Sequence, residues 1–403
     1  MKQTSGFIST YSADAFGVCS ALYELGGMIV MHDASGCNST YTTHDEPRWY
    51  DMDSMVYISA LTEIEAIMGD DSKLIEDVVR AAEELHPKFI AIVGTTIPAM
   101  TGFDADAASR VIEERTGIPT FGFATTGMKS YVHGASLAFE LLAEKLVEVQ
   151  YKKEELKNKN EKYNVVEHKM QKINILGLTP LDFSVNGSEK SIKEYYRLKG
   201  YEIISTWAMG TTLDEIKKSA EADLNIVVSE TGMGAALKLK EKYGTPYKIG
   251  ISLAGEEIDV TDEYQESINE HNLIGFFEGK INNVSDKENK AYKDDNPEIL
   301  IMGEKVSSLS LAKYLSAKTG KKCYGYATTD SDEDEIIDTI KSLDNLKVII
   351  ADPLFKPILK LIDKSKAQKI KFISLPHEAF SGRLYRNEIP NLVENTNMLL
   401  ELL

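Results

Sequence analysis

Short apolar runs rich in β-branched residues alternate with longer amphipathic segments along most of the 403 residues. This alternation is the pattern of parallel α/β units, because two parallel strands need a crossover segment, usually a helix, between them. In the first part of the chain it predicts strands at Gly27–Met31, Phe89–Val93 and Thr120–Phe123, with helices at Ser72–Leu85, Asp104–Thr116 and Gly134–Val149.

The same alternation returns twice further along the chain. A second unit is predicted from the segments Ile173–Leu178, Glu189–Leu198, Glu202–Thr206, Leu213–Ala222, Asn225–Val228, Gly234–Tyr243 and Tyr247–Ile251. A third unit is predicted from Ile299–Met302, Ser307–Thr319, Cys323–Ala327, Glu333–Leu343, Val348–Ala351, Ile373–Leu375 and a closing helix at Asn391–Leu403. The three units are similar in architecture and not in sequence, so they are not an internal repeat.

Two polar stretches separate the units. Tyr151–Lys172 is dense in Lys, Glu and Asn, and Asn283–Pro297 is polar as well, so we expect both to be solvated connectors. We therefore expect an α/β protein with a first domain over residues 1–150, a connector over 151–171, a second domain over 172–282 and a third over 283–403. Cofactors usually bind in the clefts between such domains, at the carboxyl ends of the strands.

The charge balance narrows the classes of partner. The chain has 45 Lys and Arg against 63 Asp and Glu, a formal net charge of −18 at pH 7. This argues against binding to nucleic acid or to anionic membranes, which attract clustered cationic charge. The N-terminal stretch lacks the basic and apolar regions of a signal peptide, and the longest apolar stretches fall far short of the ~20 residues of a membrane span. We therefore expect a cytoplasmic protein.

Three cysteines carry the first candidate chemistry: Cys19, Cys37 and Cys323. They are too few for a disulfide framework and one short of the four thiolates that usually hold an iron–sulfur cubane. Cys37 follows Gly36 in a loop after the first strand, where it could bind a soft metal, act as a nucleophile or pack as a small hydrophobe. Cys19, near the start of a helical pattern, could be a ligand or pack, whereas Cys323 lies in a strand and is expected to be core.

Loops after other strands offer weaker candidates. The loop from Gly94 to Asp104 lies between a strand and a helix and could hold an anion, but it lacks the spacing and the lysine of a nucleotide P-loop. No Gly-x-Gly-x-x-Gly motif opens any unit, which argues against a conventional NAD(P) enzyme. No two of the seven histidines have the spacing of a His-x-x-x-His metal pair. His377 follows the last strand and could be a proton donor in an interdomain cleft or a surface histidine.

Taken together, these motifs resemble nitrogenase component 1. The family includes the α and β subunits of the molybdenum–iron protein, the dark-operative protochlorophyllide and chlorophyllide reductases, and cofactor-assembly relatives. The resemblance covers nearly the whole chain and implies three Rossmann-like domains with parallel sheets flanked by helices. The segments that carry it are His32-x-x-x-Gly36-Cys37, Thr62-Glu63-x-Glu65-x-Ile67-x-Gly69, Gly94 to Asp104, Leu224 to Ser229 with Glu241 to Pro246, and Phe380-Ser-Gly382.

The sequence departs from the family at its metal ligands. Family subunits bind a cluster between subunits through three cysteines. Cys37 matches the second of these cysteines. The position of the first falls near residues 10–13, where this chain has no cysteine, and the position of the third corresponds to Thr96. At the α subunit's cofactor site, Ser229 stands at the cysteine position and the histidine position falls on Pro376, next to His377. The resemblance therefore argues against dinitrogen reduction on a molybdenum cofactor of that kind.

A cluster remains compatible with a pair of chains. Cys19 and Cys37 from two chains supply four ligands, enough for one [4Fe–4S] cluster on a two-fold axis. The pair is a homodimer or a heterodimer with a homologous component-1-like chain, and a carboxylate such as Asp33 is an alternative ligand.

The function that follows is a nitrogenase-like reductase component. It would take electrons through the intersubunit cluster from a separate iron–sulfur ATPase, the only partner that uses ATP, and reduce a small organic or tetrapyrrole-type substrate, not dinitrogen. A scaffold or carrier for metallocluster assembly and a cluster-free ligand-binding relative stay open. The candidate catalytic groups are His377, Glu378 and Arg383, and Arg383 could also clamp a carboxylate. The candidate cofactor or substrate contacts are Gly36, Thr96, Ser229 and Glu230. The candidate metal ligands are Cys37 and Cys19.

Overall fold

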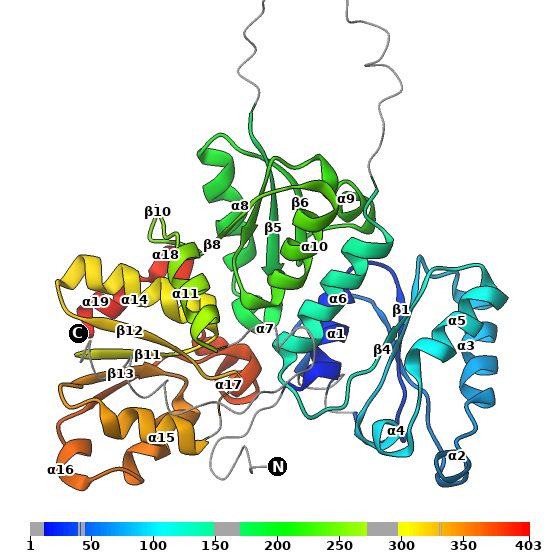
Figure 1. Ribbon diagram of the computed structural model, residues 1–403, viewed down its shortest axis with the longest axis horizontal. Coiled ribbons are helices and arrows are strands. Elements are labelled where there is room, and N and C mark those ends of the chain that lie inside the picture. Colours follow the sequence, from blue (N-terminus) through cyan, green and yellow to red (C-terminus); the bar gives the residue numbers. More distant parts are fainter. Residues whose placement is uncertain are drawn as a thin grey trace, which may run out of the picture.

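The computed structural model describes residues 12–38, 41, 45–148, 170–271, 297–329, 331 and 333–403. Most of the two predicted polar connectors lies outside these residues. The described chain forms three four-stranded sheets with helices around them, and each sheet falls within one of the three predicted units (Figure 1). All strand pairs in these three sheets are parallel, so the predicted α/β class is confirmed.

The first sheet has the strand order β2-β1-β3-β4. Successive side chains of β1 and β3 point to opposite faces, and both faces are buried under helices: α1 and α6 cover one face, and α3 and α5 the other. The edge strand β2 and the short helix α2 were not expected from the pattern. The elements are α1 (Asp14–Leu22), β1 (Met28–Met31), β2 (Met55–Ile58), α2 (Glu63–Met68), α3 (Ser72–Leu85), β3 (Ile90–Val93), α4 (Thr96–Thr101), α5 (Ala105–Thr116), β4 (Thr120–Phe123) and α6 (Tyr131–Lys145).

The second sheet has the order β6-β5-β7-β8, and a two-stranded hairpin, β9 and β10, follows it. The predicted helix over 213–222 is shorter than expected and continues as a 3₁₀ turn. The elements are β5 (Lys172–Leu178), α7 (Pro180–Phe183), α8 (Ser188–Leu198), β6 (Glu202–Ala208), α9 (Leu213–Lys217), η2 (Ser219–Glu221), β7 (Leu224–Val227), η3 (Glu230–Gly232), α10 (Met233–Tyr243), β8 (Tyr247–Ile249), β9 (Ser252–Leu253), β10 (Glu256–Glu257) and α11 (Thr261–His271).

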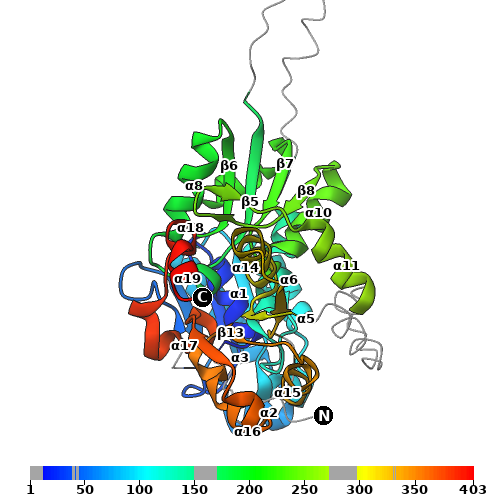
Figure 2. The same ribbon diagram turned by 90° about the vertical axis from the view of Figure 1, so that its left-hand side faces the viewer.

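The third sheet has the order β12-β11-β13-β14. The predicted closing helix is two short helices, α18 and α19, and α18 packs back on the second domain against α8 and β9 (Figure 2). The elements are β11 (Ile299–Gly303), α14 (Lys305–Thr319), β12 (Cys323–Ala327), α15 (Glu333–Ser342), β13 (Val348–Ala351), η4 (Pro353–Lys360), α16 (Lys364–Ala367), β14 (Lys371–Ser374), α17 (Glu378–Tyr385), η5 (Arg386–Glu388), α18 (Leu392–Asn395) and α19 (Asn397–Glu401).

Continuous cores join the domains. One buried cluster runs from α1 and α6 of the first domain into α10 and β6 of the second, where Phe139 packs edge-on against Trp207 at 5.6 Å between ring centroids. Another runs from the second sheet to the third and includes Val393 and Leu399 of the C-terminal helices. The carboxyl ends of β5, β7 and β11 also lie close together, because Ser229 after β7 bonds to Asp182 after β5 and the Glu230 N–H bonds to Glu304 after β11. None of the helices in the described ranges is long and apolar enough to cross a membrane.

Candidate functional site

The loop after β1 presents Cys37 to solvent. Cys37 and Gly36 are both exposed in a turn, and a Cβ added at Gly36 would meet nothing within 4 Å. The adjacent Asp33 is buried, and its carboxylate accepts hydrogen bonds from the Ala34 backbone N–H and the Asn38 side-chain amide, both at 2.8 Å. Partial burial and the Asp33 carboxylate raise the pKa of the Cys37 thiol. The thiol is therefore accessible, and a carboxylate lies next to it.

The other two cysteines lie in different surroundings. Cys19 is fully buried among the apolar residues of α1, and burial together with Glu46 raises the pKa of its thiol far above the ordinary range. Its position favours the packing alternative over metal binding. Cys323 begins the edge strand β12 and is half-buried, less than the core position expected for it, and burial raises its pKa to about 11.

Thr96 lies at the same edge of the first sheet as the Cys37 loop. It is the exposed first residue of α4, and its hydroxyl donates to the Thr126 carbonyl at 2.9 Å. The hydroxyl of Thr95 donates to the His32 carbonyl at 2.8 Å, which ties the end of β3 to the end of β1. Gly36 and Thr96, both predicted as cofactor contacts, thus follow the neighbouring strands β1 and β3, and both are exposed to solvent.

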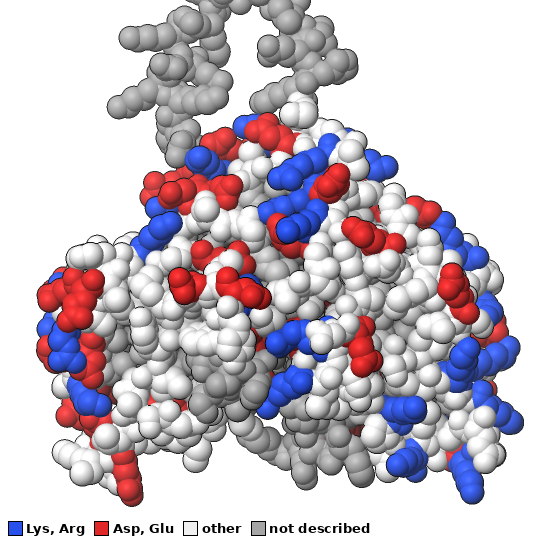
Figure 3. All heavy atoms as spheres, turned by 180° about the vertical axis from the view of Figure 1, so that it is seen from behind, with Lys and Arg blue, Asp and Glu red and all other residues white. Residues whose placement is uncertain are grey.

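Exposed apolar side chains lie beside this edge. Helix α2 has no buried residue, it contacts α4, and the Leu61 N–H just before it donates to the Asp33 carbonyl at 2.8 Å. Seen from behind, the end of the first domain that carries α2 and α4 has few charged side chains (lower left of Figure 3). We call this surface the apolar face; its residues are 37% to 83% exposed and comprise Ile64, Ile67, Met68, Ile97, Met100 and Met128.

The spacing of Thr62, Glu65 and Gly69 has a local structural reason. Thr62 and Glu65 form a reciprocal capping box at the start of α2, in which the Thr62 N–H donates to the Glu65 carboxylate at 2.8 Å. Gly69 ends the helix with φ 62°, a left-handed conformation that glycine adopts at low cost. This motif shapes the helix that presents the apolar face.

A second candidate site is a cavity between the second and third domains. Its volume is about 50 Å³, and it opens between the ends of β5, β11 and β13 and the segment that leads into α17. The walls are mostly apolar, with Phe183, Leu311 and Phe380 among them, and its titratable lining groups are Asp182, Glu304, Asp352 and His377.

His377 lies at the start of α17 with its ring in the cavity wall. Its backbone N–H donates to an Asp352 carboxylate oxygen at 2.9 Å, and the Ser381 hydroxyl donates to the same oxygen at 2.5 Å. Both ring nitrogens are buried and have no hydrogen-bond partner among the described residues. Nε2 is 3.8 Å from Asp182 Oδ1, beyond hydrogen-bond distance. Burial lowers the pKa of His377 to about 4, so the imidazole is neutral at pH 7.

Asp182 is the most heavily hydrogen-bonded group of the cavity. Its buried carboxylate accepts from four hydroxyls: Tyr131, Thr179 at 2.9 Å, Ser229 at 2.6 Å and Thr231 at 3.3 Å. Tyr131 comes from α6 of the first domain, so all three domains meet here. Burial raises the pKa of Asp182 in spite of these donors. The predicted contact Ser229 therefore reaches the cavity through Asp182.

Glu304 caps α14 and also lines the cavity. It is fully buried and accepts from the backbone N–H groups of Glu230 at 2.8 Å, Val306 at 3.0 Å and Ser307 at 2.8 Å. Burial, and next the negative charge of Asp182, raise the pKa of Glu304 to about 8. The carboxyl is therefore largely protonated at neutral pH. Glu230 itself points toward Tyr264, whose hydroxyl donates to it at 3.1 Å.

Glu378 and Arg383 lie outside the cavity wall. Glu378 is buried and accepts from the Ser184 hydroxyl at 2.6 Å and from Arg386 Nε at 2.7 Å. Arg383 forms a two-pronged ion pair with Asp45, a buried carboxylate of the first domain. Of the three residues predicted as catalytic, His377 alone lines the cavity. Arg383 joins α17 to the segment that follows the Cys37 loop.

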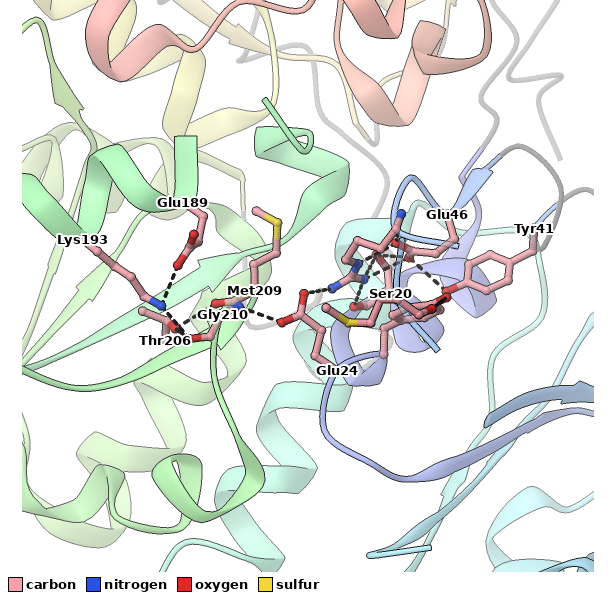
Figure 4. Close-up of polar contacts among 12 residues, drawn as sticks. Ser20, Glu24, Tyr41, Glu46, Glu189, Lys193, Thr206, Met209 and Gly210 are labelled. Atoms are coloured by element: carbon pink, nitrogen blue, oxygen red, sulfur yellow. Dashed lines mark hydrogen bonds and ion pairs between the residues drawn. The ribbon is translucent and has the colours of Figure 1, made fainter. Parts of the chain in front are cut away.

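That segment is also tied to the second domain, as Figure 4 shows. Glu46 is buried and accepts from the Ser20 hydroxyl at 3.0 Å and from Arg48 Nε at 2.6 Å. Arg48 Nη1 donates to Glu24 at 3.0 Å, and the other oxygen of Glu24 accepts from the Gly210 N–H at 2.8 Å. Segment 45–48 thus pairs directly with Arg383 of the third domain and is linked to the second domain through Glu24.

The pattern-based analysis missed Asp182 and Glu304. Both are acids at the carboxyl end of a predicted strand, a position where ligands commonly bind in parallel sheets. Their signal is weak because Asp and Glu at the start of a helix are ordinary capping residues. Across the described ranges, no three His, Cys, Asp or Glu side chains are arranged to hold a metal ion.

Comparisons with known proteins agree with the resemblance. Residues 14–255 match the sequence model of the family described as nitrogenase component 1 type oxidoreductase, and the chain belongs to this family. The structure of nitrogenase Cp1 at pH 6.5 superposes over 100% of this chain and 93% of that one, with a TM-score of 0.59 at 14% identity, which shows a shared fold.

The names of the curated relatives indicate several different functions. The iron–molybdenum cofactor biosynthesis protein NifE of Clostridium pasteurianum is 25% identical over 297 residues, 70% of this chain and 59% of NifE. The molybdenum–iron protein alpha chain of the same organism is 24% identical over 48% of this chain and 33% of its own length. One of the subunits of light-independent protochlorophyllide reductase from Nostoc punctiforme is 26% identical over 44% of this chain and 34% of its own length. The matches thus span between a third and three fifths of these relatives.

Proposed function

We propose that this chain is the substrate-reducing component of a nitrogenase-like reductase. It pairs with a second component-1-like chain, takes electrons from an ATP-dependent iron–sulfur reductase through a [4Fe–4S] cluster between the two chains, and reduces a small organic substrate, not dinitrogen. The observation that carries this proposal is the exposed Cys37 thiol beside a buried carboxylate and next to the apolar face.

The apolar face supports a second chain as partner. Large apolar side chains that gather on one exposed surface usually mark an interaction site. The interaction surface begins beside Cys37, because the Leu61 N–H that leads into α2 bonds to the Asp33 carbonyl. A partner that covers this face also removes the Cys37 loop from water, as a cluster shared between two chains requires.

The groups near Cys37 fit part of a cluster's ligand set. Cys37 is exposed, and Asp33 lies beside it, so two chains offer two thiolates and two carboxylates. Cys19 does not fit, because burial keeps its thiol protonated inside the core. We therefore favour Asp33 over Cys19 as the second ligand. When bound, the cluster supplies electrons for the reduction.

The cavity at His377 is the substrate site of this proposal. Its volume of about 50 Å³ suits a small molecule and not a tetrapyrrole. Reduction adds protons as well as electrons to the substrate, and Glu304 holds a proton at neutral pH because its pKa is raised to about 8. Neutral His377 can donate or accept one hydrogen bond to orient the substrate.

A scaffold or carrier for metallocluster assembly is the second candidate, because NifE is named as a cofactor biosynthesis protein. Such a role needs thiolates or imidazoles where the cluster binds. None of the three cysteines lines the cavity, and His377 is the only histidine among its described lining residues. This favours the reductase over a scaffold that carries a cluster in that cavity.

Electron transfer tests the proposal. The chain is purified anaerobically and mixed with an ATP-dependent iron–sulfur reductase, ATP and dithionite, and cluster reduction is followed by EPR. We expect an ATP-dependent signal that Cys37→Ala abolishes and Cys323→Ala retains. Transfer of the cluster to an apo-acceptor without any ATP-dependent reduction would instead identify a scaffold, and a chain that gives neither result would overturn both candidates.

A further inference from the structure

The charges around the cavity define the kind of molecule that it can take. Three carboxyl groups and one imidazole line it, and neither Lys nor Arg is among its described lining residues. An anion placed here would lose its hydration and face Asp182 without any compensating cation from these residues. The cavity therefore disfavours carboxylates and phosphates.

The hydrogen bonds of the cavity disfavour cations as well. Asp182 already accepts from four hydroxyls, and Glu304 accepts from three backbone N–H groups. Asp352 accepts from the N–H groups of Leu354 at 2.9 Å and His377 at 2.9 Å and from Ser381. These donors occupy most of the acceptor positions that an ammonium group would need.

The ring of His377 is the exception. Both of its nitrogens are buried without a partner among the described residues, although a buried polar group left without a hydrogen bond destabilises the folded chain. The 3.8 Å from Nε2 to Asp182 Oδ1 leaves a gap that one polar atom placed beside the two groups can bridge. The remaining walls are mostly apolar, with Phe183, Leu311 and Phe380 among them.

We propose that this cavity binds a small uncharged molecule that is largely apolar and carries one polar atom, which hydrogen-bonds to the His377 ring. This inference names the substrate class of the reductase proposed above and rests on that function for its biological meaning. Binding itself needs neither the cluster nor the reductase, so it can be tested separately.

The test uses three branched probes of similar size and different charge: 2-propanol, acetate and isopropylammonium. Each is titrated into the full chain with ¹⁵N-labelled histidine, and the His377 ring signals, assigned with the His377→Gln variant, are followed by NMR. We expect a saturable shift with 2-propanol and at least tenfold weaker effects with acetate and isopropylammonium.

Substitutions at His377 and at His133 control the result. His377→Leu should abolish saturable 2-propanol binding, followed in the variants by saturation transfer from the protein to the 2-propanol methyl signals. His377→Asn replaces it if it does not fold, and His133→Gln on α6, outside the cavity, should bind as the parent does. Equal or tighter binding of either ion would overturn the proposal. So would His377 signals that no probe moves, which would show a cavity that holds water only. ATP-dependent cluster reduction is unaffected by this outcome, so the two proposals fail separately.

Discussion

The three cysteines show how burial divides side chains of identical chemistry. Cys37 is exposed in a turn, Cys323 is half-buried at a sheet edge and Cys19 is enclosed by the core of α1. Thiolates, not thiols, react and bind metals, and burial disfavours the charged form. The same distinction makes His377 a neutral group at pH 7, whereas an exposed histidine would be partly charged.

Alkylation should therefore separate the cysteines. In the native chain we expect iodoacetamide to modify Cys37 first and Cys19 at least about a hundredfold more slowly, because Cys19 requires opening of the core. Peptide mass spectrometry against time measures both rates, and denatured protein provides the reference. Labelling of Cys19 at the rate of Cys37 would contradict the burial described here.

The stability of the chain should fall on acidification because of His377. The unfolded state takes up a proton as the pH drops below about 6.5, whereas native His377 does so only near pH 4. Between these values the unfolded state binds more protons, so stability is lost as the pH falls. From pH 7.5 to pH 5 this residue should account for about 2 kcal/mol of the loss.

Urea unfolding of the parent and of His377→Leu at the two pH values measures this contribution. We expect the variant to lose about 2 kcal/mol less than the parent over the same range. His86→Asn, at an exposed position, should follow the parent. An identical pH dependence in the parent and the His377 variant would show that the ring is not held neutral.

At the scale of elements, short segments that follow strands connect the domains. The segment 45–48 comes directly after the Cys37 loop and bonds to Arg383 of α17 and, through Glu24, to the turn after β6. His377 is the N-cap residue of helix α17, so this helix links the cavity to the segment that follows the Cys37 loop. The link between them is a set of charged hydrogen bonds with partly buried partners.

Removal of one partner of that link should be costly. Arg383→Met leaves Asp45, whose side chain is only 2% exposed, without its cation, and we expect a loss of about 3 kcal/mol in the free energy of unfolding. Arg115→Met breaks a similar pair with Glu76 on the surface and should cost at most about 1 kcal/mol. Equal losses in urea unfolding would contradict the buried character of the Asp45 pair.

The regular strands and helices were largely predictable because their patterns are local. The predicted ranges for β4, α3, β12 and β13 agree with the structure residue for residue, since apolar runs and glycine or polar ends define them. Strand β2 was missed because its apolar run, Met55–Ile58, is only four residues long, and so short a run does not by itself distinguish a strand from a helix or a loop. The end of the chain was predicted as one helix because its apolar spacing does not show the break between α18 and α19.

The candidate sites were predictable only in part. Cys37 and His377 were found from their place after strands, and the structure puts them at strand ends as expected. The pairing of Arg383 with Asp45 joins residues 338 positions apart, and no local pattern carries such a contact. Glu304 was missed for the same reason: its raised pKa arises from burial and from Asp182 in another domain.

At the scale of the whole molecule, the three domains meet around one small cavity, while the exposed thiol and the apolar face lie at the edge of the first domain. Under the proposed function, electrons would enter at this edge and the substrate at the cavity. The low number of cysteines is consistent with it, because a cluster that two chains share needs only part of its ligands from each. The central claim is that Cys37 holds such a cluster at a chain–chain interface.

Iron content in an anaerobic preparation tests this claim most directly. The chain is tagged and isolated without oxygen from its own cells, together with whatever component-1-like chain it binds, and iron and sulfide are counted per pair of chains. We predict about four of each per pair in the parent and in Cys323→Ala, and loss of both in Cys37→Ala. An iron-free pair, or one whose iron survives the loss of Cys37, would contradict the claim.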